Sequence, residues 1–334
     1  MVKKVSEKED PEENPEDQEK GEVKHTLDDI PGVGDATLSK LRKAGITSVR
    51  ALALYSPTKL AEEGGIGEKT AKKLVKTAQD IEKMGFESAD ILWEKRKDLK
   101  QLTTGSKNLD DLLAGGLETG ALTELFGEYR TGKTQLAHQL CVNVQLPYEE
   151  GGLEGGALYI DTEGTFRPER IIQMSEAKDL DYNTILKNIT IGRAYNSDHQ
   201  ILLVKEAPKI IDEKNIKLII VDSIISHFRS EYVGRGTLAT RQQLLNKHIH
   251  DLLRLTETYE ELAALFTNQV SSKPDVFYGN PTTHTGGNII AHGATIRIYL
   301  RKGKGEQRVA KVIDAPHLPE EDTTFSITEA GITD

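Results

Sequence analysis

The fold of this chain is decided by one stretch, Leu125-Phe126-Gly127-Glu128-Tyr129-Arg130-Thr131-Gly132-Lys133-Thr134. Within it, Gly127, Gly132, Lys133 and Thr134 complete the pattern G-x-x-x-x-G-K-[ST], the phosphate-binding P-loop. The glycines allow backbone N–H groups to surround a phosphate, and a helix that begins at Lys133 directs its positive end there. We expect Lys133 to reach the β- and γ-phosphates and the Thr134 hydroxyl to bind Mg²⁺.

The flanking sequence has the order of elements that a P-loop requires. Residues 121–126 form an apolar run typical of a short buried strand, and residues 135–140 have the composition of a helix. A glycine-containing turn that matches the pattern by chance is the alternative, and the strand–loop–helix order argues against it. The sequence therefore predicts a nucleotide site, with ATP and Mg²⁺ as its cofactors.

The composition is typical of a soluble protein with a sizeable core. Of 334 residues, 37% are hydrophobic and 29% charged, which allows one large α/β domain and a smaller one. The single cysteine, Cys141, predicts no internal disulfide, and its place in the predicted helix favours a packing role. The N-terminus is charged, and no apolar run approaches the roughly 20 residues of a membrane span. We expect a cytoplasmic protein without a membrane partner.

The net charge of −10 argues against nucleic-acid binding over the whole surface and leaves a local basic site open. Composition shifts then divide the chain. Residues 1–24 are rich in Glu, Asp, Lys and Pro and predict a disordered acidic tail. Residues 25–83 predict a helical domain, and residues 84–100 a linker that leads into a charged helix. Residues 101–334 alternate strand-like and helix-like stretches, as a mostly parallel sheet with crossover helices does.

The helical domain contains a repeated glycine turn. Residues 30–34 and 64–67 are short apolar-glycine hairpins, and each opens a helix with basic positions. Those positions are Lys40, Arg42 and Lys43 after the first hairpin and Lys69, Lys72 and Lys73 after the second. The pattern resembles the helix-hairpin-helix motif, which binds a DNA phosphate without reading bases. The alternative is a small helical bundle with a solvated basic face.

Polar residues come at the ends of the predicted strands 156–163, 218–223 and 262–269. Because ligands bind at the carboxyl ends of strands in open α/β sheets, these residues are expected beside the P-loop. Asp222 has the position of a Walker B aspartate for Mg²⁺, or else caps the segment after its strand. Glu163 is the best candidate to orient or deprotonate the attacking water, with a surface carboxylate as the alternative. Gln269 is placed to hydrogen-bond the γ-phosphate and change position on hydrolysis.

Two segments are candidates for contact with single-stranded nucleic acid. Residues 226–241, predicted as a loop after the Asp222 strand, interleave arginines with aromatic residues, which suits phosphate contact together with base stacking. A solvated loop is the alternative for this segment. Residues 270–293 are rich in Gly, Asn, Thr and Pro, and a loop of this length is usually functional or disordered.

Longer motifs recur in order along the chain, at residues 102–107, 126–135, 161–170, 196–200, 232–236, 267–270, 286–288 and 314–319. On these motifs the chain resembles the archaeal RadA recombinases of the RecA superfamily, which are close to the eukaryotic strand-exchange recombinases. The resemblance extends from about residue 25 to the C-terminus. It implies a RecA-like P-loop ATPase core with a mostly parallel twisted sheet, preceded by a small all-α helix-hairpin-helix domain.

The resemblance also implies an activity. The members of this recombinase family form an ATP-dependent helical filament on single-stranded DNA and exchange strands with a homologous double-stranded DNA. The implied partners are these two DNAs, further copies of the chain in filaments or rings, and recombination mediators. ATP, Mg²⁺ and a monovalent cation are the implied cofactors.

The resemblance gives roles to individual residues. The nucleotide contacts are Gly127, Glu128, Tyr129, Arg130, Thr131, Gly132, Lys133, Thr134, Gln135, Arg170, Asp314 and Pro316, where Arg170 stacks on adenine and the last two cap a neighbour's ATP. Glu163, Lys133 and Gln269 are catalytic, and Thr134 and Asp222 hold the metal. The DNA contacts are Arg229, Tyr232, Arg235, Arg241, Gly287, Asn288 and His292, where His292 also couples the phosphate to the second loop. Phe86 and Ala89 form a polymerisation motif that inserts into the next protomer.

Two other functions are consistent with parts of this pattern. One is a regulatory paralogue, an ATPase that binds recombinases or DNA without strand exchange. Such relatives usually lack the hairpin domain or the polymerisation motif, and this chain has both. The other is a DNA-binding scaffold that binds ATP without hydrolysing it, against which the complete set Lys133, Thr134, Glu163 and Asp222 argues.

Overall fold

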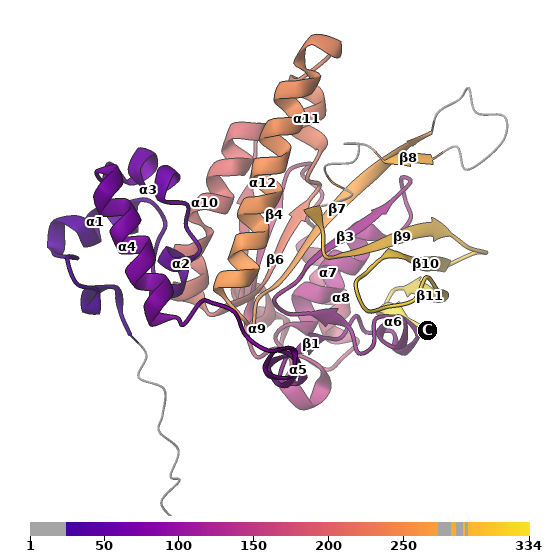
Figure 1. Cartoon of the computed structure of the whole chain (residues 1–334). Coiled ribbons are helices and arrows are strands. Elements are labelled where there is room, and N and C mark those ends of the chain that lie inside the picture. Colours follow the sequence, from indigo (N-terminus) through magenta and orange to yellow (C-terminus); the bar gives the residue numbers. More distant parts are fainter. Residues whose placement is uncertain (1–24, 273–281, 285–289, 291–292) are drawn as a thin grey trace, which may run out of the picture.

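The computed structural model describes residues 25–272, 282–284, 290 and 293–334. A helical N-terminal domain lies beside a sheet with helices on both faces (Figure 1). The predicted acidic tail, 1–24, and the predicted DNA-contact residues Gly287, Asn288 and His292 lie outside the described residues.

The central strands of the sheet bury side chains on both faces. In β6 (Ile216–Asp222), Leu218 and Ile220 pack into one core while Ile219 and Val221 pack into the other, because side chains alternate along a strand. The strand order is β12-β11-β10-β9-β3-β7-β6-β4-β5. The strands from β9 to β5 pair in parallel, and β10, β11 and β12 extend the sheet in antiparallel pairs. This confirms the mostly parallel sheet.

The bounds of the remaining strands are β1 Gln101–Leu102, β2 Leu117–Glu118, β3 Leu122–Gly127, β4 Gly156–Asp161, β5 Ile189–Arg193, β7 Ala263–Ser272, β8 Thr282–His284, β9 Ile296–Lys302, β10 Gln307–Asp314, β11 Asp322–Thr328 and β12 Gly331–Thr333. β1 and β2 pair with each other, and β8 pairs with β7. Strands predicted at 121–126, 156–163, 218–223 and 262–269 are thus confirmed as β3, β4, β6 and β7.

Helices cover both faces of the sheet (Figure 1). One layer contains α7 (Lys133–Asn143), α8 (Pro168–Glu176) and α9 (Tyr182–Lys187), and the other contains α10 (Ser197–Lys214) and α12 (Leu238–Thr258) with α11 (Ser226–Glu231) at its end. The core also holds α6 (Lys107–Leu112) and the 3₁₀ helices η2 (Tyr148–Glu150) and η3 (Arg235–Thr237). Cys141 is fully buried in α7, as its predicted packing role requires.

The prediction of a loop over residues 226–241 is wrong for most of this segment. α11 occupies its first part, and α12 begins at Leu238, so Arg241 lies on a helix. Phe228 is fully buried against the α10–α12 layer. Its burial anchors α11 as a helix, a tertiary contact that the alternation of arginines and aromatics does not reveal.

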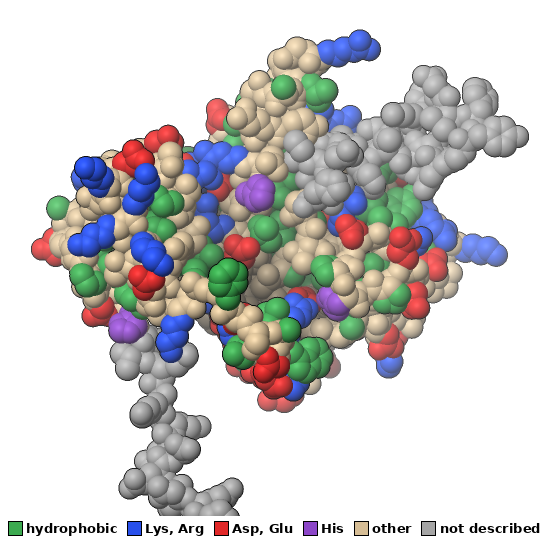
Figure 2. Space-filling model, viewed as in Figure 1, with side chains coloured by type: hydrophobic (Ala, Val, Ile, Leu, Met, Phe, Trp, Pro, Cys, Tyr) green, Lys and Arg blue, Asp and Glu red, His purple; other side chains and the backbone are tan. Residues whose placement is uncertain are grey.

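The N-terminal domain is a bundle around its own apolar core. Its elements are η1 (Leu27–Asp29), α1 (Asp35–Lys43), α2 (Val49–Ala53), α3 (Pro57–Gly64) and α4 (Glu68–Ile81). The two predicted hairpins precede α1 and α4, whose N-caps are glycines without a side-chain cap. The basic positions of both helices are exposed, and Figure 2 shows Lys and Arg interspersed with acidic side chains on the visible face of this domain.

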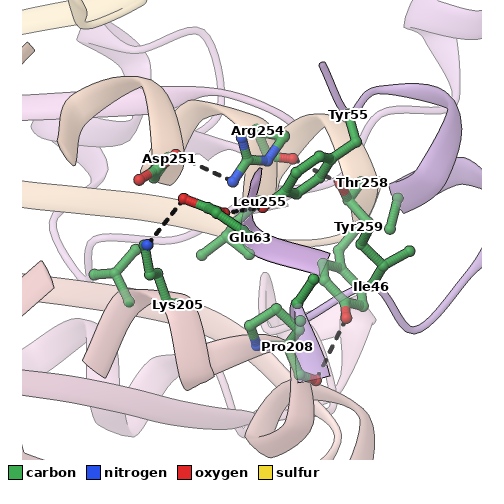
Figure 3. A pocket seen from close by; sticks show the side chains of 14 residues that line it. Ile46, Tyr55, Glu63, Lys205, Pro208, Asp251, Arg254, Leu255, Thr258 and Tyr259 are labelled. Carbon is green, nitrogen blue, oxygen red and sulfur yellow. Dashed lines mark hydrogen bonds and ion pairs between the residues drawn. The ribbon is translucent and has the colours of Figure 1, made fainter. Parts of the chain in front are cut away.

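Polar contacts hold this domain against α10 and α12 (Figure 3). Glu63 accepts a hydrogen bond from the Tyr55 hydroxyl at 2.5 Å, and its other carboxylate oxygen lies 3.1 Å from Lys205 Nζ. The Arg254 guanidinium stacks over the Tyr55 ring at 4.7 Å and binds Asp251 at 3.1 Å. These side chains line a small cavity of about 40 Å³ between the domain and the core.

The predicted linker contains α5 (Ala89–Lys97), which buries none of its residues. Phe86 is fully exposed just before it, and Ala89 is exposed at its start. Arg96 joins α5 to the core through both carboxylate oxygens of Glu118, at 3.0 and 3.1 Å. Among the described residues, no helix combines the length and the apolar character that crossing a membrane requires.

Candidate functional site

The P-loop connects β3 to α7 and requires glycine at both ends of its pattern. A Cβ at Gly127 would lie 2.2 Å from the Leu300 carbonyl oxygen on the neighbouring strand β9. Gly132 has φ +104°, and a Cβ there would meet the Ile327 side chain at 2.6 Å. Since Gly132 is the N-cap of α7 and provides no side-chain cap, the first N–H groups of the helix are available to an anion.

Lys133 lies across the mouth of the loop. Its ammonium group donates to the carbonyl oxygens of Gly127 at 3.0 Å and Glu128 at 2.8 Å. The side chain is buried, and burial lowers the pKa of this lysine, while the carboxylates of Asp222 and Glu163 oppose the shift. Its third partner, the Thr131 hydroxyl at 3.5 Å, is uncharged as well, so the cation fits the phosphate groups of a nucleotide.

Thr134 and Asp222 meet at the ends of α7 and β6. The Thr134 hydroxyl donates to the Asp222 carboxylate at 2.8 Å, as expected of the two predicted metal ligands. The same carboxylate accepts hydrogen bonds from the Tyr159 hydroxyl at 2.7 Å and from the Thr267 hydroxyl. A hydroxyl and a carboxylate are the oxygen ligands that Mg²⁺ prefers, so this pair fits the ion. Sequence reasoning missed Tyr159 and Thr267, since both lie within apolar strands.

The segment that carries Glu163 is held by Asp161. The Asp161 carboxylate accepts hydrogen bonds from the N–H groups of residues 163–166, at 3.1, 2.7, 3.2 and 3.3 Å. Arg193 binds the same carboxylate at 3.2 Å from the neighbouring strand β5. Asp161 begins the motif at residues 161–170, but the sequence does not distinguish it as a site residue beyond its position two residues before Glu163.

Glu163 and Gln269 are brought together as the strand ends predicted. The Glu163 carboxylate accepts a hydrogen bond from the Ser223 hydroxyl at 2.6 Å and from the Gln269 amide at 3.2 Å. Glu163 itself is exposed. A carboxylate that is open to solvent and held from two neighbouring strands can orient a water molecule and take its proton.

Arg170 is fixed at the edge of the loop by polar contacts. It donates to the Gln135 side chain at 2.7 Å and to the carbonyl oxygens of Thr328 and Glu329 at 2.5 and 2.6 Å. Burial lowers the pKa of its guanidinium. Tyr129 and Arg130 are exposed on the loop, and Arg130 stacks on Tyr129 at 5.6 Å.

The predicted interface residues lie apart from this cluster. Phe86 and Ala89 are exposed in the linker, and Asp314 and Pro316 are exposed at the end of β10. Within the described part of the chain, no hydrogen bond or ion pair joins them to the residues around Lys133.

The predicted DNA contacts of the first segment extend from α11, which carries Arg229, through Tyr232 and η3, which begins at Arg235, to Arg241 on α12. Arg229 and Arg235 are exposed, whereas Tyr232 and Arg241 are half-buried. Glu231, the one acidic residue between them, binds the backbone N–H of Ser197 at 2.8 Å and the hydroxyl of the same residue. Its carboxylate is therefore bound to the start of α10.

The P-loop is followed by a helix whose Thr134 meets Asp222, and the Glu163 carboxylate lies at the end of a neighbouring strand of the same sheet. This arrangement defines a P-loop ATPase of the RecA-like kind. The Rad51 family profile matches residues 95–334, and a SAM-like helix-hairpin-helix tandem matches residues 25–80. The DNA repair and recombination protein RadA of Aeropyrum pernix is 50% identical over 317 residues, which cover 95% of this chain and 99% of that relative. The chain belongs to the Rad51 family and is a DNA-dependent ATPase.

Proposed function

We propose that this chain assembles as an ATP-dependent filament on single-stranded DNA and exchanges strands with homologous double-stranded DNA. The similarity to a DNA repair and recombination protein over nearly the whole of both chains supports this function, and it gives no support to a regulatory paralogue. The observation that carries the proposal is the meeting of the Thr134–Asp222 and Glu163–Gln269 pairs beside the P-loop.

The proposed site has a division of labour for hydrolysis. The N–H groups of residues 127–134 bind the phosphates, Lys133 neutralises the β- and γ-phosphates, and Thr134 and Asp222 hold Mg²⁺. The ion, when bound, neutralises charge that develops on the phosphates. Glu163 orients water and accepts its proton, and the Gln269 amide, which lies beside Glu163, hydrogen-bonds the γ-phosphate.

Assembly completes the nucleotide site in this proposal. Phe86 and Ala89 insert into the next protomer, and Asp314 and Pro316 cover the neighbour's ATP. Arg170 stacks on the adenine of the ATP that its own P-loop binds. Head-to-tail contacts between protomers give a helical filament where they do not close and a ring where they do. The exposure of Phe86 supports this role. Removal of a large apolar side chain from water at an interface is favourable and would stabilise the contact between protomers.

The proposed DNA path runs along α11. Arg229, Tyr232, Arg235 and Arg241 contact the single strand, and Gly287, Asn288 and His292 form the second contact. The helical domain at 25–83 contacts DNA phosphates, the linker at 84–100 carries the polymerisation motif, and residues 101–334 form the ATPase core. This activity places the chain in the cytoplasm with the genome, where mediators of recombination are further partners.

The test is ATP hydrolysis with and without single-stranded DNA, alongside formation of joint molecules with a homologous duplex. We expect stimulated hydrolysis and joint molecules, both lost in Glu163→Gln, with a heterologous duplex as the control. Stimulated hydrolysis without joint molecules would support the regulatory paralogue. Absence of hydrolysis would support the scaffold, as would unchanged turnover in Glu163→Gln.

A further inference from the structure

His138 connects two parts of the ATPase site that the sequence places far apart. It lies on α7 and is 1% exposed. Its Nδ1 lies 2.6 Å from the Thr134 carbonyl oxygen, and its Nε2 lies 3.0 Å from the backbone nitrogen of Arg167. The imidazole therefore bridges the first turn of the P-loop helix and the end of the segment that carries Glu163.

The two partners fix the proton on the ring. A carbonyl oxygen only accepts, so Nδ1 carries the hydrogen; a backbone N–H only donates, so Nε2 is the acceptor. His138 is thus neutral and in the Nδ1–H form. The ring also stacks on Phe166 at 4.9 Å with an interplanar angle of 19°.

The hydrogen bond from Arg167 to His138 holds the end of the segment 163–167, whose earlier residues are held by Asp161. Asp161 binds the N–H groups of residues 163–166, and His138 binds the next one, at Arg167. The Thr134 carbonyl belongs to the residue whose hydroxyl meets Asp222. His138 therefore adds a link from α7 to the end of the Glu163 segment, beside the bonds from the Ser223 hydroxyl to Glu163 and from the Thr162 N–H to the Asp222 carbonyl oxygen.

We propose that His138 is a positioning residue for ATP hydrolysis, which fixes the Glu163 segment relative to the first turn of the P-loop helix. This inference rests on the proposed role of Glu163. A buried histidine that bonds to the carbonyl four residues earlier is also a common way to satisfy a helix residue, so the test must separate alignment from simple packing.

The test compares three substitutions. His138→Phe keeps the ring and its stacking but removes both hydrogen bonds, His138→Gln restores one donor and one acceptor, and Cys141→Ala is a matched change in packing on the same helix. Misplacement of a catalytic group by about 1 Å costs on the order of 100-fold in rate. We expect His138→Phe to lower kcat for ATP by about 10–100-fold, with the affinity for a fluorescent ATP analogue within about twofold of the wild type.

His138→Gln should recover most of kcat, and Cys141→Ala should stay within about twofold. Amide hydrogen exchange of residues 163–167, measured without nucleotide, should accelerate in His138→Phe and not in Cys141→Ala. Turnover of folded His138→Phe within twofold of the wild type would overturn the proposal. So would a loss of nucleotide affinity as large as the loss of kcat, because His138 would then support the P-loop alone.

One readout remains if His138→Phe does not fold. The ¹⁵N chemical shifts of ¹⁵N-histidine-labelled wild-type protein should show a neutral Nδ1–H imidazole signal that disappears in His138→Gln. An Nε2–H or doubly protonated ring at this position would overturn the bridge. Neither this spectrum nor the exchange rates depend on Glu163, so unchanged turnover in Glu163→Gln would refute the proposed function of Glu163 separately.

Discussion

The ion pair between Glu124 and Arg297 behind the P-loop yields a prediction with a calculable size. Glu124 on β3 is fully buried, and Arg297 on β9 is 5% exposed. Arg297 Nε lies 2.7 Å from one carboxylate oxygen of Glu124, and the Asn268 amide donates to the other at 2.8 Å. The guanidinium also stacks on Phe126, 5.0 Å from the ring centre, directly before the P-loop.

Arg297→Met keeps much of the side-chain volume but leaves the Glu124 carboxylate without its cation. Breaking a buried pair in this way costs about 3–5 kcal/mol, because an uncompensated charge remains in the core. For a domain of this size each kcal/mol lowers Tm by about 2–4 °C, so we expect a loss of about 6–20 °C. Removing both charges in Glu124→Gln with Arg297→Met should recover part of this loss.

The loss should depend on pH. Burial raises the pKa of Glu124, and Arg297 opposes that shift. Without Arg297 the folded-state pKa rises further above the unfolded value. Stability then falls as pH rises from the unfolded pKa to the folded one, by about 1.4 kcal/mol per pH unit. The deficit of Arg297→Met should therefore be smaller at pH 5.5 than at pH 7.5.

Thermal unfolding followed by circular dichroism at the two pH values measures both effects, with Arg301→Met on the exposed end of β9 as the control. The reasoning is refuted if Arg297→Met lowers Tm no more than Arg301→Met does. A deficit that is equal at the two pH values would refute the assignment to an unpaired carboxylate.

Three further predictions concern nucleotide binding, assembly and domain docking. Lys133→Ala should abolish binding of a fluorescent ATP analogue, and retained tight binding would contradict the P-loop assignment. Phe86→Glu should give monomers in sedimentation with little DNA-stimulated turnover, since an unpaired charge would be buried at the interface; filaments of normal length would disprove that role. Burial opposes the charge of Glu63, but hydrogen bonds from Tyr55 and Lys205 outweigh it and lower its pKa. The contact of the helical domain with α10 and α12 should thus be at full strength above the pKa that Glu63 has in the unfolded chain, and should weaken as pH falls through its pKa in the folded protein. In solution scattering, Glu63→Gln should show the larger radius of gyration already at pH 7, and a radius equal to the wild type's would contradict this.

The sequence determined those features that depend on short-range spacing. A P-loop is a local structure, so glycines, Lys133 and Thr134 at fixed offsets specify a phosphate site before any fold is known. The apolar runs that precede Asp222 and Gln269 predict buried strands, and parallel strands bring their polar ends to one edge. This rule was sufficient to predict that Glu163, Asp222 and Gln269 lie beside the P-loop, as they do in the structure.

Only the tertiary structure decided which groups hold those residues in place. Tyr159 and Thr267 bind Asp222, and His138 binds the end of the Glu163 segment. Their roles depend on the strand order, with β7 and β6 between β3 and β4, and no spacing within a strand specifies its neighbours. A tyrosine or threonine in an apolar strand looks like any core residue until the strand beside it supplies an acceptor. The sequence likewise predicted a loop where α11 lies, because this helix depends on the burial of Phe228 against segments that are distant in the sequence.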